Sequence, residues 1–457
     1  MNWGLTSKQK SLSLRGISLY LIFFSLSLWG IYHSKAYLSH YQQIFANLGL
    51  VTVLTCFYLF ILNLKKKPDI KIKYSMVLIV LCTVCSPIVL QTDPFRYVWD
   101  GLHSMHGINP YRFAPSDSPW ISKLKWAKQI NHPHLPSIYP PAAQFFFHIS
   151  AYLNPWQIDS NLDNWRLMFG WKLLVGLASA ILIYCFQKKR WDYILLHPLF
   201  LMTVTANAHL DSLLIAAVTS FLCMKSHFRS MGFKTISLAT AILCKWLPLL
   251  YLPGNFIYTS KRFGISKSIG SNLLVLIFTL FACSIYAIDQ ESKFFYSLGI
   301  YAQHWIFFPY IHAGLSWIFE ILGFSSHIFL AKLGNLVIGG ILACFLSLRF
   351  WQERLSFQLY LLLLSTTALA LSPTLHPWYL LILLPLGMPY FKILLTPWIW
   401  PIAGLYSQSY YLYDRELLIS RLTVYGLVSV CLAIDLKKLY KKLKPKPELQ
   451  KTSQHSF

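Results

Sequence analysis

Two carboxylates and a guanidinium group stand close together at the start of the longest polar stretch of the chain, residues 92–166. This stretch begins TDPFRYVWDG, which places Asp93 and Asp100 at positions i and i+7, with Arg96 between them. On a helix over residues 95–106 these positions share one face. A carboxylate there could act as a general base towards a hydroxyl, and Arg96 could stabilise the negative charge of a phosphate.

Further polar side chains with the same chemistry occur in short clusters along the chain. Lys245 stands in an apolar segment, where an ionisable side chain is costly and is therefore a functional candidate, unless it extends to the membrane surface. The other candidates for substrate binding are Arg112, His209, Asp211, His304 and His376. If these clusters meet, they predict a cavity that binds an anionic substrate.

Each of these residues also has a structural interpretation. Asp100 could simply pair with Arg96 or Arg112, and Asp211 could cap a helix after a short hairpin turn. His304 and His376 could be packing residues or part of an aromatic belt. Spacing alone leaves these alternatives open.

The elements that would position these side chains are predicted to be membrane helices. Of the 457 residues, 56% are hydrophobic and 12% charged, whereas about 25% are charged in a typical soluble domain. The mean hydropathy is +0.49. With 16 Trp, 27 Tyr and 32 Phe, the composition is typical of a polytopic membrane protein with aromatic belts and excludes an ordinary soluble enzyme.

Apolar runs long enough to cross a bilayer predict an all-α protein with about 11 to 14 transmembrane helices. The broken run at 233–258 fits the predicted topology as a re-entrant or broken hairpin, or as two very short helices. We expect one membrane-embedded domain over residues 1–436 and a basic tail over 437–457. Residues 120–130 alternate apolar side chains with lysines, which predicts a helix lying in the membrane interface. Clear runs cover 16–33, 44–64, 74–91, 167–186, 268–288, 327–348, 356–373 and 417–436, and broken runs 193–206, 208–224, 233–258, 377–394 and 396–411.

The formal net charge of +24 is predicted to mark orientation rather than a nucleic-acid partner. Most Lys and Arg residues fall in short clusters between apolar runs, and such residues resist translocation across the membrane. Both termini are therefore expected in the cytosol, and residues 92–166 on the opposite side. The clusters are 8–15, 65–73, 188–190, 225–234, 261–267, 349–354 and 437–451.

Neither a metal nor a cofactor is expected. All nine cysteines fall in apolar segments, and the CxxC of Cys82 and Cys85 has no His neighbour. The pairs His103/His106 and His132/His134 lack a third ligand at a fixed spacing. The chain also has no Gly-rich phosphate-binding motif.

Seven motifs follow one another between residues 92 and 386: TDPFRYVWDG, GINPYRFAP, NHPHLPSIYPPAAQ, NAHLDSLL, KWLPLLYLP, LGIYAQHWIFF and LSPTLHPWYLLILLPL. Taken in this order, they resemble the bacterial polyprenol-phosphate-mannose-dependent mannosyltransferases, which belong to the C-type glycosyltransferase superfamily. One departure is Ala208, where similar proteins often carry Gly.

The resemblance implies an inverting transferase of the bacterial inner membrane whose active site faces outward. By this resemblance its donor would be a polyprenyl-phosphate-linked sugar, with mannose as the expected sugar, and its acceptor a glycan or glycolipid. Asp93 occupies the place of the expected base, and Asp100 the second acidic position of the motif. The main alternative is a transporter or flippase of a lipid-linked saccharide, which should show internal repeats and broken helices around a midplane site.

Overall fold

The computed structural model describes residues 14–34, 37, 39–62, 72–89, 91–119, 121–156, 163–186, 191–223, 231–407 and 418–443. Within these ranges the chain is helical and forms no β-strand; its only β-type pairing is the isolated bridge between Phe307 and Thr374. The prediction of an all-α protein is confirmed.

Each of the eight clear apolar runs overlaps one helix of at least 14 residues. Their side chains are apolar nearly all round, as expected for helices buried in protein on one side and covered by lipid on the other. They are α1 (Leu14–Ser34), α2 (His40–Leu62), α3 (Ile72–Cys85), α6 (Asn164–Cys185), α11 (Ile265–Ala287), α14 (His327–Trp351), α15 (Phe357–Leu371) and α18 (Leu418–Leu443).

The remaining helices are shorter, and several begin at a proline, which fits the first turn of a helix because its missing N–H has no partner there. They are α4 (Asp93–Met105), α5 (Pro141–Tyr152), α7 (Asp192–Leu195), α8 (Asp211–Cys223), α9 (Met231–Cys244), α10 (Leu252–Phe263), α12 (Tyr296–His304), α13 (Ile311–Ile321), α16 (Leu383–Gly387) and α17 (Thr396–Leu405). The single-turn elements are η1 (Pro115–Asp117), η2 (Lys125–Gln129), the π-helix η3 (Phe200–Ala206), η5 (Leu247–Tyr251), η6 (Pro377–Ile382) and η7 (Met388–Tyr390).

Several helices are long and apolar enough to span a membrane. Four of the described helices meet this condition, and a fifth span results if η3 and α8, which are bent by 110° at their junction, count as one. Four further apolar helices have only 10 to 17 residues. The chain is thus a helical protein of membrane type, and the larger number of spans expected from the sequence stays a prediction.

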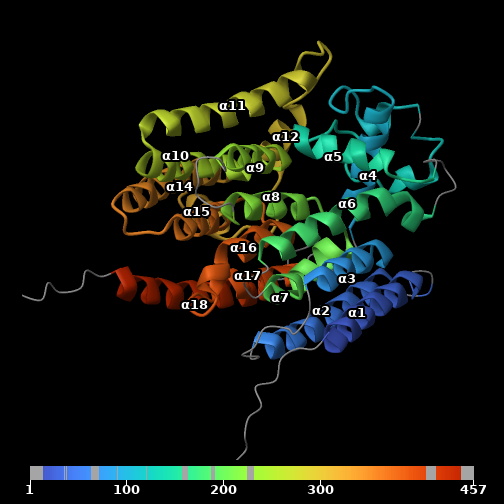
Figure 1. Ribbon diagram of the computed structural model, residues 1–457, viewed down its shortest axis with the longest axis horizontal. Helices are drawn as coiled ribbons and strands as arrows, with labels where there is room; N and C mark the ends of the chain where they lie inside the picture. The colour runs from blue at the N-terminus through green and yellow to red at the C-terminus, as the bar shows by residue number, and fades with distance from the viewer. Residues whose placement is uncertain are drawn as a thin grey trace, which may run out of the picture.

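The helices pack as neighbouring pairs around a central group. α3 packs on α6, α4 on α5, α8 on α9, and α10 on α11. In Figure 1, α4 and α5 lie at the right end, α11 runs along the top, and α18 points to the left with its C-terminal end. Only 11% of the apolar window of α14 is buried, which leaves its surface available to lipid.

Three expectations about local structure can be compared with the fold. The broken run 233–258 forms two short helices, α9 and α10, separated by η5, as one of the alternatives predicted. The prediction of an interfacial helix over 120–130 is wrong. In the described part of this stretch only the five-residue η2 forms, and its Trp126 is buried against Trp99 of α4. Helix α18 continues to Leu443, so residues 437–443 of the predicted basic tail are helical, and the rest of the tail lies outside the described residues.

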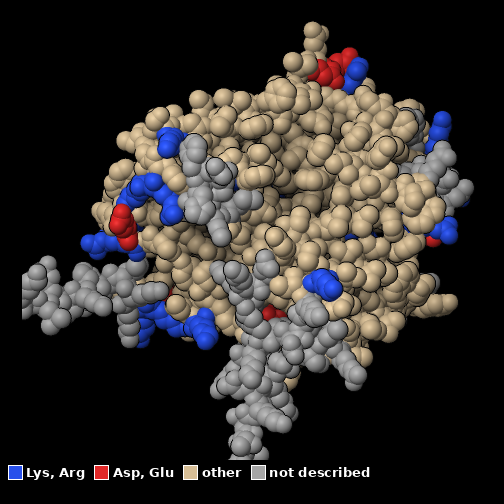
Figure 2. Space-filling model, viewed as in Figure 1, with Lys and Arg blue, Asp and Glu red and all other residues tan. Residues whose placement is uncertain are grey.

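Basic side chains are unevenly distributed over the surface. Figure 2, viewed as Figure 1, shows Lys and Arg gathered at the left end, where α10 and α14 end, and a broad uncharged belt between the charged residues at the top and those in the lower half. Lys261, Lys267, Arg349 and Arg354 belong to these predicted clusters. The uncharged belt is the surface expected of a membrane protein.

Candidate active site

A cavity of about 790 Å³ lies where α4, α8, α9, α12 and η6 meet. Six of the nine residues predicted for the site line it, although they come from four separate parts of the sequence. These six are Asp93, Arg96, His209, Asp211, Lys245 and His376. The structure therefore brings most of the predicted clusters together.

Four of these residues form a chain of alternating charge. His209 Nε2 lies 3.0 Å from Asp93 Oδ2, and His209 Nδ1 lies 2.9 Å from Asp211 Oδ2. Lys245 Nζ donates to both Asp211 oxygens at 2.9 Å. Neutral imidazole has only one N–H, so a bridge between two carboxylates favours the imidazolium form. We call Asp93, His209, Asp211 and Lys245 the charge relay.

Asp93 is the member of the charge relay best placed to meet a substrate. Its side chain is 19% exposed, whereas Asp211 is 2% exposed. Asn131 donates to Asp93 Oδ1 and His209 to Oδ2, which leaves further lone pairs on the carboxylate. Burial raises the pKa of the Asp93 carboxyl, but the hydrogen bond and charge of His209 outweigh it and hold the pKa below its ordinary value of 3.8. Asp93 is therefore ionised at neutral pH.

The sharp turn between η3 and α8 carries His209 into the cavity. Ala208 has a φ of 49°, a left-handed conformation that favours glycine. The Asn207 side chain holds the turn by accepting from Val89 N at 3.1 Å and donating to Met202 O at 2.6 Å. Trp171 Nε1 of α6 donates to Ala208 O at 2.6 Å.

Lys172, next to Trp171 in α6, stabilises the end of η3 that leads into this turn. Its ammonium group is buried and donates to three backbone carbonyls: Thr83 at 3.1 Å, Ala206 at 2.9 Å, and Ser86. These carbonyls lie at the ends of α3 and η3, where helices leave carbonyls without partners. All three ammonium hydrogens are used, so Lys172 joins α3, α6 and η3 at one point.

Substituting Lys172 with Met is expected to destabilise the protein without changing any residue that lines the cavity. Each buried carbonyl that loses its donor costs about 1–3 kcal/mol. We expect the thermal midpoint in detergent to fall by at least about 4 °C, measured by scanning fluorimetry. The matched control is Lys332→Met, because Lys332 also donates to two carbonyls, those of Ala302 and Gln303, but in an exposed position. Equal midpoints for Lys172→Met and the wild type would contradict this role.

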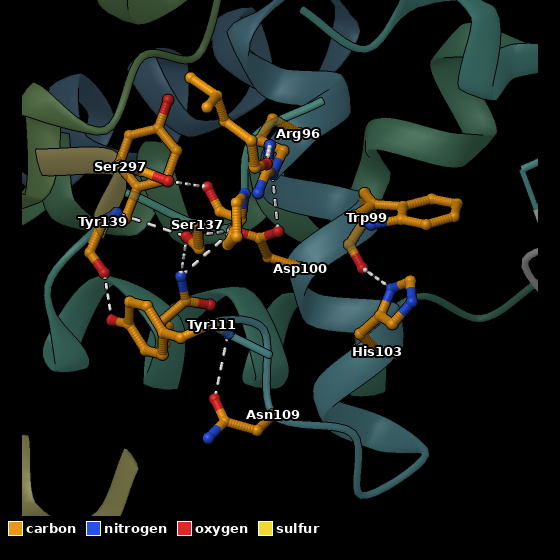
Figure 3. A network of polar contacts seen from close by, with 12 residues as sticks. Arg96, Trp99, Asp100, His103, Asn109, Tyr111, Ser137, Tyr139 and Ser297 are labelled. Carbon is orange, nitrogen blue, oxygen red and sulfur yellow. Dashed lines mark hydrogen bonds and ion pairs between the residues drawn. The ribbon is translucent and has the colours of Figure 1, made fainter. Parts of the chain in front are cut away.

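Arg96 and Asp100 form a second, buried network beside the cavity. Arg96 Nε donates to Asp100 Oδ1 at 2.8 Å, and Asp100 Oδ2 accepts from Ser137 at 2.6 Å and Gln144 at 3.1 Å. Figure 3 shows both side chains turned from α4 towards the loop that carries Ser137 and Tyr139. Asp100 is 1% exposed and fixes the Arg96 guanidinium, while Arg96 Nη2 is buried with no partner in the described part of the chain. Arg96 thus offers one unused donor at the cavity wall.

Three predicted site residues lie elsewhere. Asp100 does not line the cavity, because both of its carboxylate oxygens bind Arg96 and the loop; this is the structural interpretation of that residue. Arg112 pairs with Glu291 at the surface. His304, at the end of α12, is exposed outside the cavity, and the neighbouring Trp305 lines it instead.

An aromatic wall, formed by His376, Trp378 and Tyr379 around the start of η6, faces the charge relay. Trp378 stacks on His209 with ring centroids 4.4 Å apart, and His376 stacks on the other side of Trp378 at 4.5 Å. Burial lowers the pKa of His376 to about 3, so this imidazole is neutral at pH 7. Its Nδ1 is buried and has no hydrogen-bond partner among the described residues.

Sequence reasoning missed Asn131, Trp378, Tyr379 and Lys172. Lys172 carried the same signal as Lys245, an ionisable residue inside an apolar run, and could have been found by it. Asn131, Trp378 and Tyr379 stand within the motifs that the resemblance quotes, but no spacing rule connects them to Asp93. Only the fold places them there.

Among the residues described, no group of three or more His, Cys, Asp or Glu side chains is placed to hold a metal ion. The charge relay supplies two carboxylates, but a lysine and a histidine already neutralise them. The groups of the cavity wall that a substrate could meet include the Asp93 carboxylate, the Arg96 guanidinium, the Lys245 ammonium and aromatic rings.

Comparisons with protein-family models, with curated proteins and with solved structures find no match for this chain.

Proposed function

We propose that the protein is a membrane glycosyltransferase that moves a sugar, mannose by resemblance, from a polyprenyl-phosphate carrier to a glycan or glycolipid acceptor. The observation that carries the proposal is an ionised carboxylate, Asp93, at the wall of a large cavity in a protein rich in apolar helices. The cavity has room for a monosaccharide and its acceptor group, since ligand sites usually measure about 300–1,000 Å³.

The reaction would be a direct displacement. Asp93 accepts the proton of the acceptor hydroxyl as that oxygen bonds to the anomeric carbon, and the bond from this carbon to the phosphate oxygen breaks. Polyprenyl phosphate leaves with the bonding electrons, so its negative charge grows. The cations that line the cavity and could stabilise that charge are Arg96, whose Nη2 has no hydrogen-bond partner among the described residues, and Lys245, whose side chain is 25% exposed.

The remaining predicted residues take more limited roles in this proposal. Asp211 was expected to hold sugar hydroxyls, but its oxygens bind Lys245 and His209, so we assign it to the charge relay. Asp100 positions Arg96. His376 stays a substrate-binding candidate, and Arg112 and His304 are left without a role in the reaction.

The test is a donor panel. Membranes containing the protein are incubated with radiolabelled polyprenyl-phosphate mannose, glucose, galactose or arabinose, and label in the extracted glycan and glycolipid fractions is counted. We expect label from one of these donors, with mannose first, and none from GDP-mannose in sealed vesicles. Absence of transfer from every lipid-linked donor would refute the proposal.

Orientation is part of the proposal, with the cavity facing outward and both termini in the cytosol of a bacterial inner membrane. It is supported by the basic clusters at the ends of α10 and α14, at the opposite end of the molecule from α4 and α5 (Figures 1 and 2).

Labelling at position 117 tests this orientation. Asp117 is exposed in the loop after α4, and it lies outside the cavity lining. In a chain whose nine cysteines are replaced, Asp117→Cys is expected to react with an impermeant maleimide added to whole spheroplasts. Reaction only after the membrane is opened would reverse the topology.

A transporter or flippase of a lipid-linked saccharide is the second candidate function. One observation favours it: the helix pair η3 and α8 is broken next to charged residues, as transporter helices often are. A transporter would move the intact donor across the bilayer without releasing polyprenyl phosphate.

A further inference from the structure

Both basic members of the charge relay lie against aromatic rings from two consecutive residues. The Trp378 ring is stacked on His209, 4.4 Å between centroids and 27° between planes. Lys245 Nζ lies 3.8 Å from the centre of the Tyr379 ring. Since His209 precedes α8 and Lys245 follows α9, one short segment of the chain contacts two cations from separate parts of the sequence.

This segment is held by a part of the chain that carries none of the charge relay. Leu375 N donates to Phe307 O at 2.8 Å, and Thr374 Oγ1 donates to Trp305 O at 3.0 Å. The Tyr379 hydroxyl bonds to that of Tyr301 at 2.6 Å. The segment that carries Trp378 is therefore tied by hydrogen bonds to α12 and the residues after it, in addition to the packing of η6 on α8.

Stacking on Trp378 affects the charge of His209. The face of an indole ring is electron-rich and attracts a cation more strongly than a neutral group. The charged and titratable groups around His209 are Asp93 and Asp211 at its nitrogens, the Tyr97 hydroxyl at 3.3 Å, and Lys245 beyond Asp211. His376 lies behind Trp378 and is neutral. Trp378 thus covers the face of a ring whose edges are held by two carboxylates.

We propose that Trp378 is a positioning residue that keeps His209 protonated and oriented between Asp93 and Asp211. The inference rests on the proposed function only for its effect on turnover, because the contact between Trp378 and His209 exists without substrate. Removing the ring would allow His209 to lose its proton at lower pH and to turn away from one carboxylate. Asp93 would then lose a hydrogen bond that fixes its direction.

The first readout does not need activity. The protein is labelled with ¹⁵N-histidine, and the ring-nitrogen signals of His209, assigned by comparison with His209→Gln, are followed through a pH titration in detergent micelles. For Trp378→Leu we expect the titration midpoint of His209 to fall by about half a unit to one unit, and for Trp378→Phe by less than half of that. An unchanged midpoint in Trp378→Leu would overturn the proposal, even if the donor panel shows no transfer.

The second readout is the pH profile of kcat/KM for sugar transfer. The protonated form of His209 is lost as pH rises, so the alkaline limb should move to lower pH by the same amount in Trp378→Leu and return most of the way in Trp378→Phe. The matched control is Trp398→Leu, because Trp398 is buried against Tyr193 and Phe391, outside the cavity lining. If Trp398→Leu moves the alkaline limb of the kcat/KM profile by the same amount as Trp378→Leu, the shift is a general packing effect and the assignment of Trp378 is overturned.

Discussion

Asp93→Asn is expected to lower kcat for sugar transfer by about 10²–10⁴-fold, the usual contribution of a general base. The amide has nearly the same size and keeps an acceptor for Asn131 or His209, but it cannot take the proton of the attacking hydroxyl. KM for the lipid-linked donor should change little, because Arg96 and Lys245 are intact. The measurement is transfer kinetics in membranes with equal amounts of each variant.

The matched control for this variant is Asp117→Asn, which removes a carboxylate from the same extended loop, outside the cavity lining. It should transfer sugar at the wild-type rate. In the wild type, the depressed pKa of Asp93 keeps the carboxylate ionised until the pH falls below 3.8, so Asp93 should cause no loss of activity between pH 5 and 7. Near-normal turnover of Asp93→Asn would remove this residue as the base.

Breaking the charge relay at Asp211 is expected to have the second large effect. Asp211→Asn leaves the Lys245 ammonium and the His209 imidazolium without their shared carboxylate, and removing one partner of a buried ion pair costs about 3–5 kcal/mol. Lys245→Met leaves the Asp211 carboxylate to His209 alone. Both variants should show lower thermal midpoints in detergent than the wild type.

The double variant Asp211→Asn/Lys245→Met distinguishes a coupled pair from two independent residues. Because it removes both charges, its midpoint should fall by clearly less than the sum of the two single changes. Sugar transfer should stay low, since His209 still lacks its second carboxylate. Simple additivity of the midpoints would show that Asp211 and Lys245 do not act as a pair.

The fold could be predicted well where one physical effect dominates. Long apolar runs form helices because a chain in lipid must make all the hydrogen bonds of its backbone internally. Every clear apolar run forms a helix in the structure. The stretch 120–130 shows the limit of this reasoning. Its alternating Lys and apolar residues fit an interfacial helix, but Trp126 gains more from burial against Trp99 than from a regular helix in the interface.

The site could be predicted only as a set of candidates. Each cluster had polar residues in an apolar setting, and six of nine meet at one cavity. A shift of a few ångströms in the position of a side chain decides whether a carboxylate faces a cavity or pairs with a guanidinium. The spacing of residues in the sequence does not fix that position. Asp93 and Asp100 share the expected helix, yet Asp100 is buried by Ser137 of the loop before α5 and by Gln144 of α5, and the sequence did not reveal the path of this segment.

The most direct test of the central claim is the fate of the donor. Right-side-out membrane vesicles containing the protein receive a synthetic polyprenyl-phosphate mannose labelled in both the sugar and the lipid, and the two labels are separated after incubation. The proposed transferase predicts one free polyprenyl phosphate for each mannose found in glycan or glycolipid, with neither product formed by Asp93→Asn vesicles. Intact donor moved into the vesicles, with both labels still joined, would contradict it and identify a transporter.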